Sequence, residues 1–526
     1  MTAQEMGPSE LAVLLRDAAA RHADRVAIID GDRRFTYREL ADQARRFGAA
    51  LVAHGIRPGD RVAIWAFNSA EWIIALLGSH QALATVLPVN TRFKGGEAAD
   101  ILHRGRARVL VTVTDFLGND YVGMLRDAGR PLPHLETIVI AVGPARDGTD
   151  TWEAFLQSGR EEDLAELDHR AAQSRSDTPA DLLYTSGTTG APKGVICTHA
   201  QTIAVARDWA LMTGLSAGDR YLMINPFFHM FGMKAGILAS VSQGATMIPL
   251  AVFDADRAME LVGEHGVTVL PGPPTLYQTI LDHPALGSRD LSTLRVGVVG
   301  AADIPTDLVR RMYAELPFSL IVSGYGLTEA GTASSTAPTD SAETIAKTVG
   351  RARPGFEIRI VDKTGADAEP GEIGEILLRG PSVMSGYADD PAATASALKD
   401  GWLHTGDLGR LHDDGLLSIA GRTKDMYIVG GFNAYPAEIE SILMRHESVR
   451  QAAVIGVPDD RLGEVGAAYV VLRAPVEADV LLAWCRDQMA NYKVPRRLTF
   501  VDALPLNASG KVDKRVVRTW PEEPPR

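Results

Sequence analysis

A short segment rich in glycine, hydroxyl side chains and one lysine carries the clearest chemistry in this sequence. Residues 184–194 read YTSGTTGAPKG and follow the apolar pair Leu182-Leu183, which we expect to end a strand. Glycines let successive backbone N–H groups turn toward one anion, hydroxyls add neutral donors, and Lys193 adds a positive charge. The segment therefore predicts a polyphosphate site. The Walker spacing is not present, and a plain surface turn is the alternative that composition alone allows.

The composition limits the class of protein. A chain of 526 residues is too long for one ordinary core, so we expect at least two domains. Hydrophobic residues make up 46% and charged residues 23%, as in globular proteins, and the net charge of −13 argues against nucleic-acid binding. The two cysteines, Cys197 and Cys485, lack the spacing of a metal site or a disulfide framework. Acidic residues near the N-terminus argue against a signal peptide, so we expect a cytoplasmic protein.

The elements that must position this chemistry are those of an α/β fold. Strand-like runs such as 62–65, 109–113 and 267–270 alternate with helical stretches, which predicts layers of helices on mostly parallel sheets. An amphipathic helix is expected near Leu11. From about Val361, short strands and tight turns predict a β-rich subdomain, whereas the polar segment 337–348 predicts a loop.

Two further segments need an interpretation at this level. After Arg422, a unit of ordinary domain size begins again, with Pro436 near a helix start. The uncharged run 235–253 could suggest a membrane span, but serines, a glycine and Pro249 interrupt it. We therefore expect a helix, a turn and a strand there, with no integral membrane contact.

Four more motifs follow the glycine-rich segment in a fixed order. They are Ser323–Glu329 (SGYGLTE), Gly401–Asp407 (GWLHTGD), Gly421–Asp425 (GRTKD) and Asn507–Lys511 (NASGK). The five together resemble the signature of the adenylate-forming (ANL) superfamily, which includes acyl-CoA synthetases, and the resemblance spans most of the chain. It implies an N-terminal AMP-binding domain at 1–421, a hinge at 422–424 containing Lys424, and a small mobile C-terminal α+β domain at 425–526.

The resemblance implies a site for ATP and Mg²⁺. Its phosphate loop would comprise Thr185, Ser186, Gly187, Thr188, Thr189, Gly190 and Lys193. Its nucleoside pocket would comprise Gly300, Ala301, Ala302, Gly324, Tyr325, Gly326, Thr328, Asp407 and Arg422. Tyr325 would stack on adenine, and Asp407, supported by Arg422, would accept hydrogen bonds from the ribose. Glu329 and Thr185 would hold the metal ion.

The resemblance also implies the catalytic groups, Lys511, His229 and Lys193. Lys511 would bridge the attacking carboxylate and the α-phosphate, stabilising charge in the transition state. In a second conformation of the C-terminal domain, Gly430, Gly431 and Phe432 would line the tunnel for the pantetheine arm of coenzyme A. Many relatives carry arginine where this chain has Leu506, so one phosphate or CoA contact is in question.

The acyl pocket would include His229, Lys234, Gly300 and Gly326. Lys234 stands out because the residues around it are apolar, and a buried lysine is costly without a partner. A polar acyl group with keto or carboxylate oxygens would supply one. Two alternatives stay open: Lys234 points to solvent, or it pairs with a nearby acid. For His229, the alternative is a core histidine.

The motif set and pocket segments are similar to one subgroup, the actinobacterial CoA ligases of the steroid ring C/D propanoate. The resemblance implies an acid–thiol ligase that takes a small carboxylic acid, ATP and CoA and forms an acyl-CoA through an acyl-adenylate. It leaves a homodimer open. One alternative is an adenylating enzyme whose acceptor is an amine, nitrite or a carrier-protein thiol. Another is a nucleotide-binding sensor, against which Lys511 and Glu329 argue, because binding alone does not need both.

Overall fold

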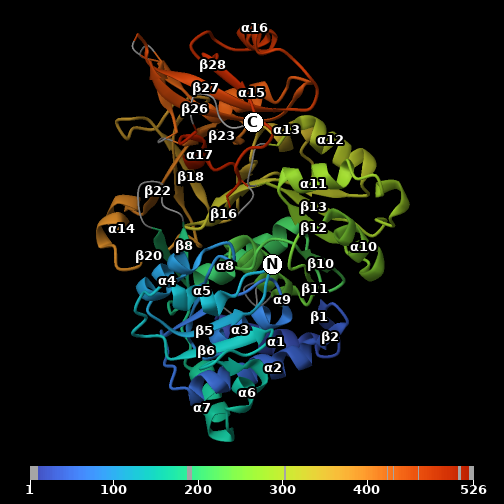
Figure 1. Ribbon diagram of the computed structural model, residues 1–526, viewed down its shortest axis with the longest axis vertical. Helices are drawn as coiled ribbons and strands as arrows, with labels where there is room; N and C mark the ends of the chain where they lie inside the picture. Colours follow the sequence, from blue (N-terminus) through green and yellow to red (C-terminus); the bar gives the residue numbers. More distant parts are fainter. Residues whose placement is uncertain are drawn as a thin grey trace.

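The computed structural model describes residues 10–185, 192–300, 304–422, 425–429, 432–459, 461–507 and 511–520. A large N-terminal region carries a smaller C-terminal domain, drawn in orange and red at the top of Figure 1. Within these described ranges, no helix is long and apolar enough to cross a membrane. The expected α/β class, with a large and a small domain, is confirmed.

Two large sheets form the body of the N-terminal region. The first has the strand order β20 (Gly386–Tyr387), β9 (Lys193–Thr198), β8 (Pro179–Thr185), β4 (Thr85–Pro88), β3 (Arg61–Trp65), β5 (Ala107–Val113), β6 (Thr137–Val142), β7 (Asp150–Thr151). The second has the order β14 (Leu320–Val322), β13 (Val296–Val299), β12 (Val269–Gly272), β10 (Arg220–Met223), β11 (Thr246–Pro249), β1 (Val26–Asp30), β2 (Arg33–Thr36). Most neighbouring strands in both sheets are parallel, as the alternation of elements predicts.

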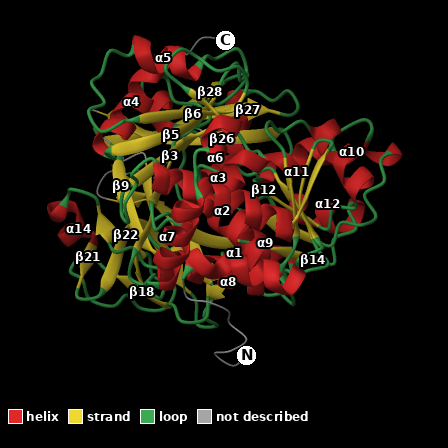
Figure 2. Ribbon diagram, turned by 90° about the horizontal axis from the view of Figure 1, so that it is seen from below, coloured by secondary structure: helices red, strands yellow, loops and turns green. Residues whose placement is uncertain are grey.

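Helices fill the space between these sheets and cover their outer faces. Figure 2 shows a group of helices in the centre of the molecule. The central group includes α1 (Leu11–His22), α2 (Tyr37–Ala53), α3 (Ala70–Gln81), α7 (Glu161–Ala172), α8 (His199–Thr213), the π-helical segment η2 (Phe231–Leu238) and α9 (Ala239–Gln243). Others are α4 (Gly95–Arg104), α5 (Tyr121–Asp127), α6 (Trp152–Gln157), α10 (Ala255–His265), α11 (Pro274–Leu281), η3 (Leu286–Ser288) and α12 (Thr306–Glu315).

Short antiparallel sheets follow, as the turn-rich pattern predicts. They contain β15 (Gly324–Leu327), β16 (Gly331–Ser335), β17 (Arg351–Ala352), β18 (Glu357–Val361), β19 (Gly374–Arg379), β21 (Leu398–Lys399), β22 (Trp402–Leu411) and β23 (Leu417–Arg422), with α14 (Pro391–Ala397) beside β20 to β22. The C-terminal domain contains β24 (Tyr427–Val429), β25 (Phe432–Ala434), α15 (Pro436–Leu443), β26 (Val449–Asp459), β27 (Gly463–Leu472), α16 (Ala478–Gln488), β28 (Arg497–Phe500) and α17 (Lys514–Val517). Pro436 begins α15, as expected.

Local sequence signals explain most element boundaries. The apolar stripe from Leu11 to Ala18 is buried on α1, and Thr36 begins α2 with a capping box to Glu39. The run 235–253 forms helix, turn and strand, as expected, with Gly244 in the left-handed conformation at the turn.

The loop prediction for 337–348 is wrong for its second half. Residues Ala342–Lys347 form the helix α13. The side chain of Ser341 accepts a hydrogen bond from the Thr344 amide at the N-terminus of this helix, and Ile345 is fully buried against the core. One buried apolar residue and a serine cap stabilise a helix that the polar composition concealed.

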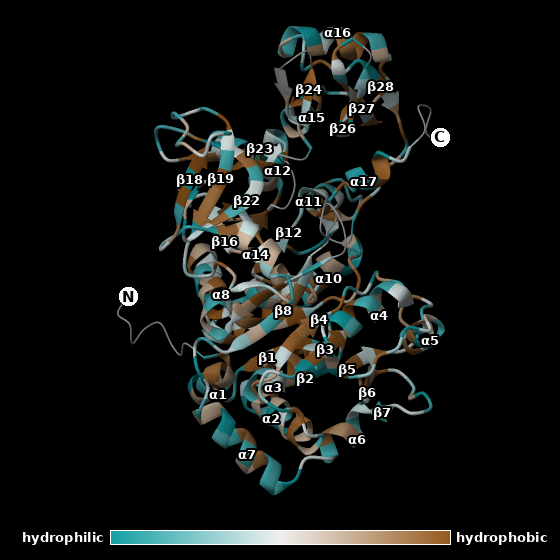
Figure 3. Ribbon diagram, turned by 90° about the vertical axis from the view of Figure 1, so that its left-hand side faces the viewer, coloured by the Kyte–Doolittle hydropathy of each residue, from teal (hydrophilic) through white to brown (hydrophobic). Residues whose placement is uncertain are grey.

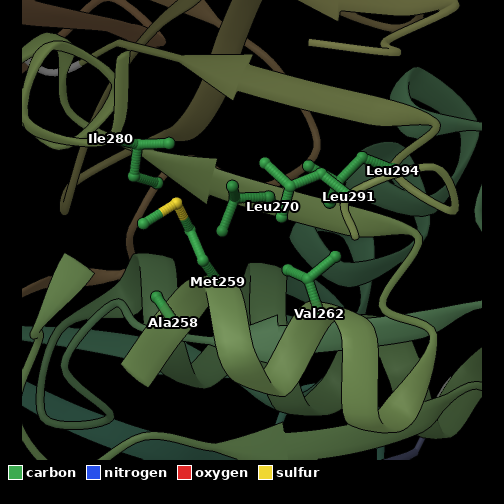
Figure 4. A pocket seen from close by; sticks show the side chains of 7 residues that line it. All are labelled: Ala258, Met259, Val262, Leu270, Ile280, Leu291 and Leu294. Carbon is green, nitrogen blue, oxygen red and sulfur yellow. The ribbon is translucent and has the colours of Figure 1, made fainter. Parts of the chain in front are cut away.

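The apolar cores leave little free space. Brown, hydrophobic strands occupy the interior in Figure 3, and the C-terminal domain has its own core around Tyr427 and Leu481. Figure 4 shows a cavity of about 10 Å³ among apolar side chains of α10, β12 and α11. This volume barely admits one water molecule, and the lining offers that water no polar partner, so the cavity is a packing defect rather than a ligand site.

Candidate active site

The predicted phosphate loop connects β8 and β9, which form an antiparallel hairpin. Thr185 and Lys193 are paired in register at the end of the hairpin next to this loop, and the Thr185 hydroxyl donates to the Lys193 carbonyl at 3.5 Å. Ser186, Gly187, Thr188, Thr189 and Gly190 lie outside the described residues. The hairpin nevertheless places the hydroxyl of Thr185 and the ammonium group of Lys193 at the two ends of the connecting segment.

Glu329, the predicted metal ligand, lies next to this hairpin end. The Tyr387 hydroxyl donates a hydrogen bond to Glu329 Oε1 at 3.0 Å, and Lys193 Nζ lies 5.0 Å from the centre of the Tyr387 ring. Burial raises the pKa of the Glu329 carboxyl, whereas hydrogen bonds from the backbone and from Tyr387 lower it and offset part of this rise. A carboxylate offers about four acceptor positions, so this contact leaves Glu329 able to bind Mg²⁺. The carboxylate of Glu329 and the hydroxyl of Thr185 are oxygen ligands, which suit this hard cation.

The predicted ribose acceptor is held by two side chains. Asp407 is 6% exposed; its Oδ1 lies 2.9 Å from Arg422 Nε, and its Oδ2 accepts from the Tyr325 hydroxyl at 2.6 Å. Asp407 and Arg422 are also direct partners in the pairing of β22 with β23. Burial and the neighbouring Asp407 raise the pKa of Tyr325 well above its usual value, so this hydroxyl stays protonated. The remaining lone pairs of Asp407 can accept the two ribose hydroxyls.

Small residues border the predicted adenine site. A Cβ atom on Gly300 would lie 3.7 Å from the Gly324 carbonyl, so the ends of β13 and β15 meet there. A Cβ atom on Gly326 would lie 2.3 Å from the Gly331 carbonyl, which excludes any larger residue from this strand pair. Thr328 follows in the turn before Glu329. Ala301 and Ala302 lie outside the described residues.

His229 lies two residues before η2, in the segment that follows β10 of the second sheet. Its Nδ1 accepts a hydrogen bond from the Phe231 amide at 3.2 Å, which leaves the proton of the neutral ring on Nε2. Burial, and after it the positive charge of Lys511, lowers the pKa of His229 to about 4. His229 is therefore neutral at pH 7, and its Nε2–H can donate to a substrate carboxylate.

The C-terminal lysine turn contacts the N-terminal region. The Lys511 amide donates to Asn507 Oδ1 at 3.0 Å, and Arg92 Nη1 donates to the Asn507 carbonyl at 3.2 Å. The positive charge of Lys511 contributes, after burial, to the lowered pKa of His229. The structure therefore places the turn that carries Lys511 against the N-terminal region, 282 positions after His229 in the sequence.

Lys234 is buried, and its partner is an acid of the protein. Its Nζ lies 2.9 Å from Asp181 Oδ1, with the two side chains 1% and 0% exposed. Asp181 Oδ2 also accepts from the Thr202 hydroxyl at 2.5 Å. The burial that would lower the pKa of Lys234 is outweighed by Asp181 and Cys197, so this pKa is raised. Of the readings left open, pairing with a nearby acid is the one observed, and a substrate group is not needed to balance the charge.

The remaining predicted residues lie mostly outside the described part of the chain. This holds for Lys424, Gly430 and Gly431, whereas Phe432 is described only as the first residue of β25. The side chain of Leu506 is 46% exposed.

Sequence reasoning missed Tyr387, Asp181 and Arg92. Tyr387 lies 58 positions from Glu329, and only the pairing of β20 with β9 brings it to the hairpin. The sequence did contain a signal for Asp181, because it is an acidic residue directly before the apolar pair Leu182-Leu183 of the same strand. The Arg92 guanidinium donates to a backbone carbonyl, a contact that no residue pattern reveals.

Comparisons with known proteins show the family to which the chain belongs. The family described as AMP-binding enzyme matches residues 15–388, and the AMP-binding enzyme C-terminal domain matches residues 438–511. The chain therefore belongs to the AMP-binding enzyme family, and the resemblance drawn from its motifs is confirmed.

Individual relatives cover nearly the whole chain. The 3-[(3aS,4S,7aS)-7a-methyl-1,5-dioxo-octahydro-1H-inden-4-yl]propanoyl:CoA ligase of Rhodococcus jostii is 46% identical over 97% of this chain and 98% of its own length. The protein of the same name from Mycobacterium tuberculosis is 49% identical over 94% and 96%. The crystal structure of the anthranilate CoA ligase AuaEII with anthranoyl-AMP has a TM-score of 0.89 and 29% identity, covering 99% of this chain and 98% of that one.

Proposed function

We propose that this protein is an ATP-dependent acid–thiol ligase that forms an acyl-CoA through an acyl-adenylate. The observation that carries the proposal is the contact of Arg92 with the Asn507 carbonyl, which holds the turn of Lys511 against the N-terminal region that contains the Tyr325–Asp407–Arg422 cluster. A protein that only bound a nucleotide would not need a lysine from its C-terminal part at the place where the acid reacts.

The chemistry consists of two displacements. A carboxylate oxygen of the acid attacks the α-phosphorus of ATP, and pyrophosphate leaves. The thiol sulfur of CoA then attacks the acyl carbonyl, and AMP leaves with the oxygen that the carboxylate supplied. Mg²⁺, when bound by Glu329 with Thr185 nearby, would offset the negative charge of the phosphates.

Each of the predicted site residues has a separate role in the first displacement. Neutral His229 donates from Nε2 to the carboxylate and orients it, while Lys511 lies between that carboxylate and the α-phosphate. Lys193 and the phosphate loop bind the departing pyrophosphate, and Asp407 holds the ribose. Gly300 and Gly326 leave room for the adenylate beside Tyr325.

We assign the substrate to compact, keto-bearing cyclic propanoic acids. The support is the identity of 46% and 49% to two ligases whose names specify a methyl-dioxo-octahydroindenyl propanoyl group. The observed Asp181 partner removes Lys234 as an argument for a polar acyl group, so the relatives carry this assignment.

We further assign residues 1–421 to the AMP-binding domain, 422–424 to the hinge and 425–526 to the mobile domain. The end of β23 at Arg422 and the separate core around Tyr427 support this division. Lys424 would rotate at the hinge, after which Gly430, Gly431 and Phe432 would face the pantetheine arm. The two buried free thiols, Cys197 and Cys485, agree with a cytoplasmic enzyme.

A panel of acids, each assayed with and without CoA, tests this proposal. We expect acid-dependent AMP and pyrophosphate, faster with CoA, and a kcat/KM for the dioxo-indane propanoate that exceeds that for palmitate. A preference for palmitate would overturn the substrate assignment alone. Turnover with an amine or nitrite in place of CoA would overturn the assignment of the acceptor.

A further inference from the structure

Tyr387 contacts both charged groups of the predicted metal and phosphate site, Glu329 and Lys193. Its hydroxyl donates to Glu329 at 3.0 Å, while Lys193 Nζ lies 5.0 Å from the centre of its ring. The side chain is half-buried, and burial together with Glu329 raises its pKa, so the hydroxyl carries its proton at neutral pH.

The backbone fixes the position of this side chain. Tyr387 is the direct partner of Val195 in the antiparallel pairing of β20 with β9. Side chains two residues apart on a strand share a face, so Lys193 and Val195 face the same way. The diagonal neighbour Lys193 is then within reach of the Tyr387 ring.

Hydrogen bonds on both sides of Tyr387 prevent it from moving along β9. The Ser385 amide donates to the Ile196 carbonyl at 2.9 Å, and the Ala388 amide donates to the Gly194 carbonyl at 2.7 Å. The Met384 amide donates to the backbone carbonyl of Glu329 at 2.7 Å. One short segment is therefore tied both to the hairpin of the phosphate loop and to the residue that would bind the metal.

We propose that Tyr387 is a positioning residue for this site: its hydroxyl orients the Glu329 carboxylate, and its ring separates Glu329 from Lys193. The inference rests on the proposed function, which assigns a cation to Glu329 and phosphates to Lys193. Without the ring, the flexible Lys193 and the Glu329 carboxylate, which contact the same tyrosine, would pair with each other. Each would then have to give up its partner before nucleotide and metal could bind.

Two substitutions separate the two parts of this role. Tyr387→Phe retains the ring and removes the hydrogen bond, whereas Tyr387→Leu removes both. The readout is the affinity for α,β-methylene-ATP, measured by calorimetry with and without Mg²⁺. The ratio of the affinity with Mg²⁺ to the affinity without Mg²⁺ reports what the metal contributes to binding, independently of turnover.

We expect Tyr387→Phe to reduce this ratio about 10-fold, as is typical when a hydrogen bond to a metal-binding carboxylate is lost, and to leave the metal-free affinity unchanged. Tyr387→Leu should also weaken metal-free binding, because Lys193 would then pair with Glu329. In a Glu329→Gln background, Tyr387→Phe should have no further effect. An unchanged ratio in Tyr387→Phe, or a further effect in that background, would overturn the proposal.

Tyr37→Phe is the matched control for general loosening. Tyr37 is fully buried on α2, and its hydroxyl donates to the Ala245 carbonyl at 2.7 Å, remote in sequence from every site residue. It should lower the unfolding temperature and leave the ratio as in the wild type; an equal change in the ratio would show that Tyr387 acts only through stability. A wild-type ratio of one would contradict the proposed function, and with it the role of Tyr387.

Discussion

Replacing Lys234 with methionine removes one charge from a fully buried ion pair. The ammonium group lies 2.9 Å from Asp181 Oδ1, and neither side chain is more than 1% exposed. Methionine fills a similar volume without a charge. The substitution therefore leaves the buried Asp181 carboxylate with the hydrogen bond from the Thr202 hydroxyl but without its opposite charge.

The expected loss of stability follows from this burial. Breaking a buried pair by removing one partner typically costs about 3–5 kcal/mol, because the remaining charge is uncompensated. At about 2 °C per kcal/mol for a large domain, the unfolding temperature should fall by roughly 6–10 °C. The double variant Lys234→Met/Asp181→Asn removes both charges and keeps an acceptor for Thr202, so we expect it to recover most of the loss.

Differential scanning calorimetry at pH 7.5 measures this difference. The control is Arg45→Met, which removes a surface pair with Asp168 whose side chains are 42% and 63% exposed. That pair should contribute less than about 1 kcal/mol. Lys234→Met could instead unfold at the wild-type temperature and change the preference among acyl substrates. That result would show that Lys234 contacts the substrate rather than Asp181, and it would refute this reasoning.

Three further perturbations test other parts of the site. Lys511→Ala should slow adenylation about 10²–10³-fold, yet still convert a supplied acyl-adenylate and CoA to thioester at nearly the wild-type rate; equal damage to both steps would contradict its role. Asp407→Asn should lower kcat/KM for ATP about 10–100-fold with little change in KM for the acid, because it weakens the contacts of the ribose acceptor. Burial lowers the pKa of His80, and that of His199 to about 4, so the unfolded chain binds protons first as pH falls below about 6.5. The free energy of unfolding should therefore decline from pH 6.5 toward pH 4, and less steeply in His80→Leu than in the wild type. Calorimetry across this range would contradict this role of His80 if the two proteins lost stability equally.

The nucleoside side of the site was predictable because its residues lie in recognisable motifs. Tyr325, Asp407 and Arg422 were each named from the sequence, and the structure brings all three into contact. Their roles toward a bound nucleotide remain predictions. What the motifs did not give is the geometry of the pairing of β22 with β23, which sets Arg422 directly opposite Asp407.

The parts that could not be predicted depend on contacts between distant segments. The apolar neighbours of Lys234 indicate a buried charge that needs a partner, but they leave solvent exposure open, and the partner, Asp181, lies 53 positions earlier on another element. Tyr387 belongs to a strand of two residues, too short to produce a periodic signal. The helix α13 was missed because polar composition outweighed the serine cap and the one buried isoleucine that stabilise it.

Transfer of an oxygen atom from the acid to AMP tests the central claim most directly. The enzyme would be incubated with ATP, Mg²⁺, CoA and the dioxo-indane propanoate labelled with ¹⁸O in its carboxylate, and the nucleotide product analysed by mass spectrometry. Attack of the carboxylate on the α-phosphorus predicts pyrophosphate and AMP carrying one ¹⁸O atom, with the thioester retaining the other. Formation of ADP, or of AMP without the label, would contradict an acyl-adenylate intermediate.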